Sequence, residues 1–351
     1  MAEVLAHAMS HSRAYLCVDA FIADMGGATA LASAFETGVI DHLARNPGAD
    51  VDAISSALSL NAPGLAVLLD MLRANGVISA SLDAPALAPD FEEALKFRDL
   101  LEAKIHFAKS VAPDFLHLLT ALLMEPDAFA AQARVFKLFS YGHALKATAE
   151  NIERTARWMR LTTALTRYEA GACMDVHDFS VYRQMLDVGG NSGEFVLQLC
   201  RAHPGLQATV YDLPVVCDIG RAHLAAEPEA GRVGFVKVAH LKPALPIGRD
   251  LICFKSMLHD WPHAEMLDFL RRAHEALAPG GTLLIFERTQ LKLGGKQVAY
   301  GQLPLFLFFR SYRSADVYGD ALHTLGLVSI NVVHVPLDMP FILITARKAG
   351  A

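Results

Sequence analysis

The most informative segment of the chain is LDVGGNSGEF, residues 186–195. Its pattern is that of an apolar strand running into a glycine turn and then into a helix, which is typical of a nucleotide-binding loop. Asn191 occupies a position where such a loop often has another glycine, and no lysine follows to grip a phosphate. Asparagine adopts left-handed backbone geometry at low cost, so we expect the turn to tolerate it.

From residue 183 onward, short apolar runs alternate with helix-like segments of about 10–15 residues, which predicts a parallel sheet with right-handed crossovers. The helix that precedes the fifth strand is expected to end at Pro279-Gly280-Gly281. Two further strands, LVSINVVHV and FILITARK, are expected to finish the sheet in antiparallel orientation. The first five predicted strands are QMLDVGG, QATVYDLP, VGFVKVA, RDLICFKSML and TLLIFERTQ.

Polar residues follow several of these strands, where a doubly wound sheet binds its ligands. Asp212 ends the second strand, 23 residues after Gly189. An acid at that position is placed to accept hydrogen bonds from both hydroxyls of a ribose. The turn and the acid together predict an adenosine-containing cofactor. His259 follows the fourth strand and Glu287 ends the fifth.

The loop favours S-adenosylmethionine (SAM) over NAD. A pyrophosphate is typically bound by G-x-G-x-x-G at a helix start, and this chain lacks that spacing. Glu194 also lies just beyond the turn, where it would repel a pyrophosphate. SAM has no phosphate and carries a sulfonium and an ammonium, so acids near the loop are compatible with it.

The first hundred residues indicate a winged-helix arrangement. ATALASAFETGVIDHLA predicts one helix, and a short aspartate-capped helix follows it. Asn61 caps a further helix over 61–75, and VISASLDAPALAP predicts a small β-hairpin. Because helix 61–75 has no basic stripe for phosphates, the sequence favours packing against another subunit over DNA binding. The predicted apolar face of the first helix is formed by Leu31, Phe35, Val39 and Leu43.

The composition is that of a compact globular protein of about two domains, with 351 residues, 53% hydrophobic and 19% charged. The net charge of −6 does not favour nucleic acid as a partner. The most apolar stretches, FLHLLTALLM and LPLFLFF, are expected to be too short to span a bilayer. No signal peptide is recognisable, and the five cysteines are expected to be reduced thiols. We therefore expect a cytoplasmic protein.

Several motifs, in order, resemble the SAM-dependent O-methyltransferases of the caffeate and acetylserotonin type, which include bacterial natural-product enzymes. These motifs are LDVGGNSGEF, VYDLPVV and FKSMLHDWPHAEMLDFLRRAHEALAPGGTLLIFE. The resemblance covers essentially the whole chain. It implies a helical winged-helix dimerisation domain over 1–110, a helical acceptor-pocket segment over 111–180, and a Rossmann-like SAM-binding domain over 181–351. It also implies a homodimer formed through the amino-terminal domain.

The resemblance implies a role for each residue that matches a family motif. Gly189 would lie along the cofactor, and Asp212 would bind the ribose. Leu213 would line the adenine, and Lys255 would also contact the cofactor.

The resemblance further implies that His259 is the general base and that Glu287 positions it. Histidine titrates near neutral pH, so it can take a proton from a phenolic or enolic hydroxyl. A neighbouring carboxylate orients the ring and stabilises the imidazolium that forms. The predicted reaction is methyl transfer from SAM to a small-molecule acceptor.

The chain departs from the family pattern at two positions. The segment VAHLKP lacks the usual aspartate after the third strand, so His240 or Leu241 would have to contact adenine. Tyr312 aligns with a second acid that plant members use to support the base. Arg167 and Arg310 are candidates for binding a substrate carboxylate. The candidate lining of the acceptor pocket is Phe136, Tyr141, His143, Trp158, Met159, Thr163, Arg167, Met174, Phe306 and Phe309.

Alternative functions remain open from the sequence. One is C- or N-methylation of a related small molecule, for example a 2-oxo acid. Others are a SAM-dependent enzyme that does not methylate, and a winged-helix DNA-binding regulator. The histidines show no HxH or HExxH spacing, so no metal site is expected.

Overall fold

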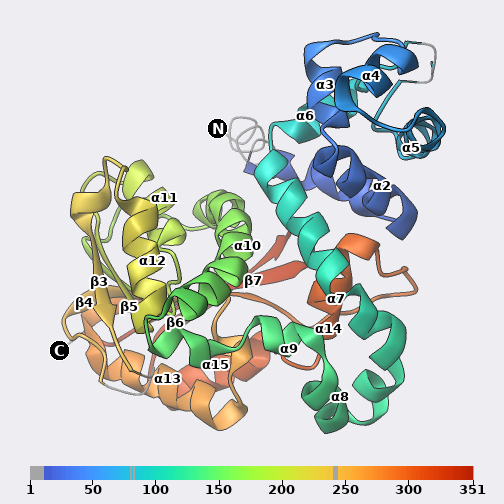
Figure 1. Ribbon diagram of the computed structural model, residues 1–351. Coiled ribbons are helices and arrows are strands. Elements are labelled where there is room, and N and C mark those ends of the chain that lie inside the picture. The colour runs from blue at the N-terminus through green and yellow to red at the C-terminus, as the bar shows by residue number, and fades with distance from the viewer. Residues whose placement is uncertain (1–11, 80, 82–83, 240–243, 351) are drawn as a thin grey trace. The chain divides into compact units, whose positions relative to one another are not determined.

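The chain divides into two compact units in the computed structural model (Figure 1). The helical unit comprises Ala14–Val135 and Leu293–Leu307. The sheet unit is built mainly from Phe136–Lys292 and Phe308–Ala351. The division into three functional segments with boundaries near 110 and 180 stays a prediction. The structure describes residues 12–79, 81, 84–239 and 244–350.

The helical unit confirms the predicted helix caps. Asp50 Oδ1 accepts a hydrogen bond from the Ala53 N–H at 2.7 Å, and Asn61 Oδ1 accepts one from the Gly64 N–H at 3.0 Å. These caps satisfy backbone donors that the first helical turn leaves free. The elements of this unit are η1 (Ala14–Ile22), α2 (Met25–Glu36), α3 (Val39–Arg45), α4 (Val51–Leu58), α5 (Ala62–Ala74), α6 (Pro89–Leu95), α7 (Arg98–Met124), α8 (Pro126–Gln132), η5 (Tyr300–Gln302) and α14 (Leu303–Leu307).

The prediction of one continuous helix over ATALASAFETGVIDHLA was wrong. α2 ends at Glu36 and α3 starts at Val39, because Gly38 between them has a φ of 80°. Glycine adopts this left-handed geometry without steric cost, and it turns the chain there. Of the predicted apolar face, Leu31 and Val39 are buried on either side of the break.

Among the described residues of the predicted hairpin, Ile78 and Leu87 form one antiparallel bridge. The Ser79 N–H donates to the Ala86 carbonyl at 2.8 Å, and the Ala88 N–H donates to the Val77 carbonyl at 3.0 Å. Residues 80 and 82–83 of this segment lie outside the described residues.

The apolar stretch FLHLLTALLM lies within a helix that is longer than the stretch itself. This stretch belongs to α7, whose 27 residues are long and apolar enough to cross a membrane by length and composition alone. Within the most apolar 18-residue stretch of this helix, 33% is buried. Lys104 on this helix is buried and forms an ion pair with Asp19 of η1 at 2.6 Å.

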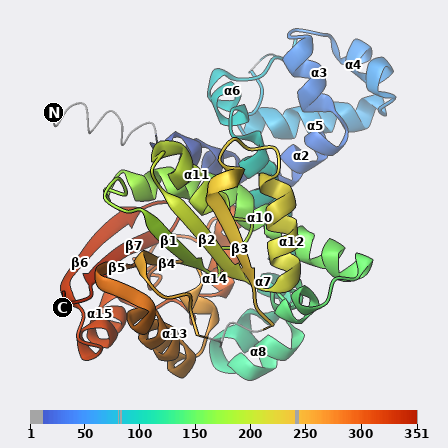
Figure 2. The same ribbon diagram turned by 90° about the vertical axis from the view of Figure 1, so that its left-hand side faces the viewer.

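In the sheet unit, the strands of the described chain form one sheet in the order β3-β2-β1-β4-β5-β7-β6 (Figure 2). β1 to β5 run parallel, as predicted. β7 is antiparallel to β5, also as predicted, but β6 pairs antiparallel with β7 and therefore runs parallel to the first five strands, so the prediction was wrong for β6. The strands are β1 (Gln184–Val188), β2 (Gln207–Asp212), β3 (Val233–Lys237), β4 (Arg249–Lys255), β5 (Leu277–Arg288), β6 (Val328–Pro336) and β7 (Pro340–Arg347).

The helix before β5 ends earlier than predicted. α13 (His263–Ala276) stops at Ala276, and Pro279-Gly280-Gly281 already belong to β5. The other helical elements of this unit are η2 (Tyr141–Leu145), α10 (Ala149–Met174), α11 (Glu194–Ala202), α12 (Pro214–Leu224), η3 (Ala230–Arg232), η4 (Leu258–Asp260) and α15 (Ala315–Thr324), and α9 (Arg134–Leu138) spans the boundary between the units.

Both faces of the sheet are buried, which explains why its strands read as continuous apolar runs. In β4, Ile252 and Phe254 contact one core with residues of α12, α13 and α15, whereas Leu251 and Cys253 contact a second core with α11 and the end of α10 (Figures 1 and 2). The carboxyl ends of the parallel strands therefore remain as the edge where polar side chains gather.

We predict that Gly38→Ala lowers the free energy of unfolding by roughly 1 kcal/mol, because alanine is strained at positive φ. Gly319→Ala is the matched control. Gly319 lies within α15 without a positive φ and with nothing within 4 Å of an added Cβ, so this change should stabilise by about 0.5–1 kcal/mol. Urea unfolding followed by circular dichroism measures both. A Gly38→Ala variant as stable as the native chain would contradict the role assigned to the break.

Candidate functional site

The loop after β1 has the left-handed geometry that its sequence predicts. Gly189 and Gly193 have φ angles of 70° and 76°, and Asn191 between them has a φ of 57°. The Asn191 N–H donates to Asp212 Oδ2 at 2.8 Å, and Asn191 Oδ1 accepts from the Ser192 N–H at 2.7 Å. The asparagine is thus tolerated, as expected, and it ties this loop to the end of β2.

Two glycines of the loop leave no room for a side chain. A Cβ on Gly189 would lie 2.6 Å from Met257 Cγ, and one on Gly190 would lie 2.7 Å from Asp187 Oδ2. The backbone of the loop therefore packs directly against the end of β1 and the turn after β4.

Helix α10 fixes the loop from one side. Its residues make successive polar contacts with the loop and with the first residue of α11. The Asn191 and Ser192 side chains are therefore held in place before any ligand binds. The contacts are Thr162 Oγ1 with Asn191 Nδ2 at 3.1 Å, Thr163 Oγ1 with Ser192 Oγ at 2.7 Å, and Arg167 Nε with Glu194 Oε1 at 3.3 Å.

Asp212 ends β2 as a buried carboxylate. Besides Asn191, the Leu213 N–H donates to its Oδ1 at 2.7 Å. Burial raises the pKa of Asp212 to about 6, although the two N–H donors partly offset that effect. The group is therefore ionised at neutral pH and has acceptor capacity left on both oxygens. The Leu213 side chain is 8% exposed and belongs to the core beside it.

A small cavity of about 80 Å³ lies beside Asp187 of β1. Within the described chain, neither carboxylate oxygen of Asp187 has a hydrogen-bond partner, and burial raises its pKa to about 8. Ser256 Oγ and Arg288 Nε line the same cavity and are likewise unpartnered among the described residues. Buried polar atoms without partners are costly, so this cavity has the features of a ligand site.

Lys255, predicted to contact the cofactor, lies in a buried ion-pair network. Its Nζ bonds the Glu169 carboxylate and donates to Thr166 Oγ1 at 2.8 Å. Arg288 Nη2 pairs with the other oxygen of Glu169 at 2.6 Å. Burial alone would raise the pKa of Glu169, but the two cations outweigh it and leave that pKa below its usual range. Lys255 also lines the cavity beside Asp187.

His259 and Glu287 meet as the sequence analysis expects. His259 lies in η4, just past β4, and its Nδ1 is 2.8 Å from Glu287 Oε2. The fully buried Glu287 also accepts at Oε1 from the N–H groups of Met257 and Leu258, at 2.6 and 2.7 Å. One carboxylate thus fixes both the turn and the imidazole. Nδ1 carries the proton that Glu287 accepts, and Nε2 is left as the basic nitrogen.

A second carboxylate faces the other side of the imidazole. Asp260 Oδ1 lies 3.4 Å from His259 Nε2, and its Oδ2 accepts from the Tyr141 hydroxyl at 2.5 Å. Burial lowers the pKa of His259, but Glu287 and Asp260 outweigh it and leave the pKa above its ordinary value. Burial raises the pKa of Asp260, against the opposing effects of His259 and Tyr141.

Two residues before α15 complete the surroundings of the imidazole. The buried Tyr312 ring lies 5.5 Å from the His259 ring between centroids. Arg313 donates to the carbonyls of Leu258 and Trp261, which brackets the η4 turn. Tyr312 therefore places an aromatic ring beside His259, at the position where plant members of the family have a second acid.

The structure brings few of the candidate acceptor-pocket residues to His259. Tyr141 reaches it through Asp260, and Trp158 packs on Tyr141 with ring centroids 5.7 Å apart. His143 instead contacts Asn151 at 3.1 Å. Other candidates have other neighbours. Met159 belongs to the core, and the rings of Phe136 and Phe306 pack edge-to-face against Phe308 and Phe115. The Arg310 guanidinium lies over the Phe309 ring.

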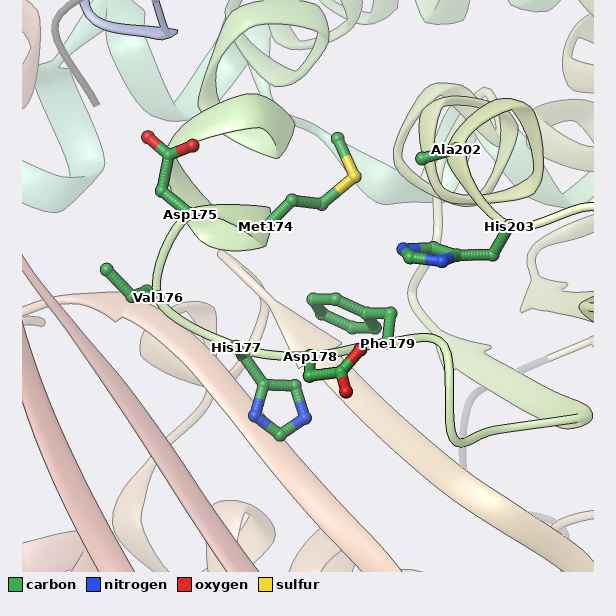
Figure 3. A pocket seen from close by; sticks show the side chains of 8 residues that line it. All are labelled: Met174, Asp175, Val176, His177, Asp178, Phe179, Ala202 and His203. Atoms are coloured by element: carbon green, nitrogen blue, oxygen red, sulfur yellow. The ribbon is translucent and has the colours of Figure 1, made fainter. Parts of the chain in front are cut away.

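Met174 lies in a different hollow, of about 440 Å³, formed by segments that precede β1 and β2 (Figure 3). There Phe179 lies near the imidazole of His203, with ring centroids 6.3 Å apart. The proposed lining role of Met174 is therefore wrong. His240 and Leu241, the candidates for adenine contact, lie outside the described residues.

Sequence reasoning placed Asp187 and Asp260 at strand ends but gave them no role, and it did not pair Tyr141 with Asp260. It missed Glu169 and Arg288 altogether. Asp187 stood inside the first segment quoted, and its position in an apolar strand was a usable signal. Glu169 and Tyr141 gave none, because their partners lie 86 and 119 residues away.

Comparison with known proteins places this site in a family. A family model described as an O-methyltransferase domain matches residues 124–309, just over half of the chain. The chain is 27% identical over 265 residues to the O-methyltransferase SfmM3 of Streptomyces lavendulae, covering 74% of this chain and 75% of that protein.

Other similarities are more local or more distant. The 3-hydroxy-5-methyl-1-naphthoate 3-O-methyltransferase of Streptomyces sahachiroi is 38% identical over 110 residues, which is 31% of this chain. The aligned region spans about a third of the length of the first curated relatives it matches. The solved structure of human N-acetylserotonin methyltransferase in complex with SAM is 20% identical and has a TM-score of 0.70, covering 92% of this chain and 94% of that one.

These similarities confirm the predicted fold, an α/β methyltransferase sheet with a helical amino-terminal part. The matching region includes the loop after β1, the end of β2 and the His259–Glu287 pair. The chain belongs to the O-methyltransferase domain family.

Proposed function

We propose that this protein transfers a methyl group from SAM to a phenolic or enolic hydroxyl of a small molecule, with His259 as the general base. The observation that carries the proposal is the pairing of the partly buried His259 with the fully buried Glu287, 2.8 Å apart, at the carboxyl edge of the sheet. Removal of a proton from a hydroxyl requires a base that is held in a fixed position beside the ligand site.

SAM, when bound, supplies a methyl group already activated by a sulfonium. The chain supplies the positions that would hold it. The Asp212 carboxylate suits the ribose hydroxyls, and Gly189 permits close approach of the cofactor to the loop backbone. The unpartnered Asp187 oxygens can accept hydrogen bonds from an ammonium, whose charge would favour the ionised form of this acid, and Lys255 lines the same cavity. Leu213 remains the candidate for adenine contact.

The role of Glu287 is to hold the His259 imidazole so that Nε2 stays basic. Because the pKa of His259 is raised, a larger part of the population is protonated near neutral pH than for an ordinary histidine. Turnover should therefore rise with pH through the neutral range as the imidazole loses its proton. The imidazolium that forms during the reaction is stabilised by the same carboxylate.

The acceptor class is inferred from relatives and from the surroundings of the base. Two relatives are named for O-methylation of a hydroxynaphthoate and of acetylserotonin, both of which are aromatic. Near the base, the rings of Tyr141 and Trp158 pack together, and Tyr312 faces the imidazole. Flat aromatic surfaces of this kind suit an aromatic acceptor.

We predict that the chain binds SAM and not NAD, and that Asp212→Asn weakens SAM binding about 10- to 100-fold through loss of a charge-assisted hydrogen bond. Because the pKa of Asp212 is raised to about 6, SAM affinity should be constant above that pH and fall as pH drops below it. Titration calorimetry measures both effects. Asp218→Asn, which alters an exposed ion pair with Lys237, is the control. Preferred binding of NAD would overturn the cofactor assignment.

We predict that His259→Ala lowers turnover by at least about 100-fold and leaves SAM affinity unchanged, because only proton removal is lost. His263→Ala, an exposed change at the start of α13, serves as the control. Mass spectrometry of an aromatic hydroxyl panel with methyl-labelled SAM identifies the acceptor and the methylated atom. Unchanged turnover in His259→Ala would remove this residue from the mechanism.

We further propose that the protein is a cytoplasmic homodimer that pairs through the amino-terminal helical domain over 1–110. Val67 and Met71, four residues apart on α5, are 61% and 39% exposed, which leaves one apolar strip on that helix. The cysteines are free thiols in the described chain, as suits a reducing compartment.

The dimer proposal predicts that Val67→Asp shifts the protein from a dimer to a monomer, because a charge would be buried at the interface. Ile247→Asp is the matched control, since Ile247 is 82% exposed in the sheet unit. Sedimentation velocity gives both masses. A dimer that persists in Val67→Asp, or a monomeric native chain, would refute the proposed interface.

A further inference from the structure

The Tyr141 hydroxyl holds a carboxylate at the basic nitrogen of His259. Tyr141 begins η2, far from η4 in sequence, and donates to Asp260 Oδ2 at 2.5 Å. The other oxygen, Asp260 Oδ1, lies 3.4 Å from His259 Nε2. The Asp260 carboxylate is therefore shared between a phenol and an imidazole.

The geometry on the two sides of the imidazole is unequal. Glu287 Oε2 lies 2.8 Å from Nδ1, and its Oε1 is committed to the N–H groups of Met257 and Leu258. That carboxylate cannot move without breaking the turn. Asp260 Oδ1 lies 0.6 Å further from its nitrogen (3.4 minus 2.8), and the other oxygen of Asp260 is bonded to the Tyr141 hydroxyl.

The other groups around the imidazole do not compete for Nε2. Arg288 lowers the pKa of His259 through its charge but is bound to Glu169. Arg313 is bound to the Leu258 and Trp261 carbonyls. Tyr312 presents its ring. Among the described residues, Asp260 is thus the carboxylate whose distance from Nε2 is adjustable.

We propose that Tyr141 is a positioning residue that keeps Asp260 back from His259 Nε2 and so leaves this nitrogen open to an incoming hydroxyl. A carboxylate in full contact with Nε2 would favour the imidazolium before any substrate arrives and would occupy the position where the proton must land. With Asp260 restrained, Nε2 is unprotonated in a larger part of the population. The proposal rests on the proposed function only for the identity of His259 as the base.

The proton balance of the step is simple. The acceptor O–H bond breaks, an N–H bond forms at Nε2, and the electron pair stays on the acceptor oxygen. The positive charge that forms on the imidazole then lies close to Asp260 Oδ1, which is 3.4 Å from Nε2 and can stabilise it. Asp260 is in this way held off before the transfer and is near enough to stabilise the charge after it.

The test is the titration of His259 in the full chain, followed by NMR of carbon-13-labelled histidine and assigned with the His259→Ala variant. Tyr141→Phe should raise the pKa of His259 by about one unit, because the released Asp260 moves closer to Nε2. Asp260→Asn should lower that pKa, and the double variant should match Asp260→Asn. Tyr182→Phe, which removes a hydroxyl bonded to His177, is the control and should leave the titration unchanged.

Kinetics separate positioning from a structural role. In Tyr141→Phe, the acidic limb of the kcat/KM profile should move to higher pH by the same amount, with the rate at high pH close to native. A uniform loss at every pH, or an unshifted titration in Tyr141→Phe, would overturn the proposal, as would a shift that persists in the double variant. The titration requires no turnover, so it stands apart from the test of the reaction itself.

Discussion

The carboxylate of Glu287 is the group on which the geometry of the edge depends. Glu287 is the next-to-last residue of β5 and is fully buried. Its carboxylate accepts hydrogen bonds from two consecutive backbone N–H groups and from an imidazole. A buried carboxylate is stable only when such donors surround it. Because the donors come from the turn after β4, the parallel pairing of β4 and β5 fixes the direction of His259 without any flexible intermediary.

Asp212 has a comparable structural role at the ends of β1 and β2, where the cofactor would bind. Asp212 accepts from the backbone of Asn191 and of Leu213, so one carboxylate joins the ends of β1 and β2. Helix α10 adds side-chain contacts to the same loop and buries Glu169 beneath it. The ligand edge is therefore built from strand ends that the sheet aligns and from one long helix that closes them, which fits the general requirement for a rigid binding site.

Whether a feature of the fold or of the site could be predicted depends on how far apart in the sequence the interacting residues lie. The parallel sheet and the strand-end positions of Asp212, His259 and Glu287 follow from local periodicity and the rules of parallel topology. The direction of β6 was missed because no local pattern shows that β7 lies between β5 and β6. The break at Gly38 was missed because the apolar spacing of three and four residues runs straight through it.

The pairing of Tyr141 with Asp260 depends on how a distant segment packs, and no local pattern encodes it. The same holds for Glu169 with Lys255. The apolar length of α7 was underestimated because polar residues interrupt the pattern without ending the helix.

The cavity beside Asp187 links ligand supply to protein lifetime. The unpartnered oxygens make the ionised form of Asp187 costly, so the fold gains nothing from this acid until a cation meets it. An apolar residue there would give a more stable chain with a poorer site, a common trade between stability and activity. If a cationic cofactor fills the position, its concentration in the cell also sets the fraction of chains protected from unfolding and proteolysis. The amount of enzyme would then follow the supply of its own methyl donor.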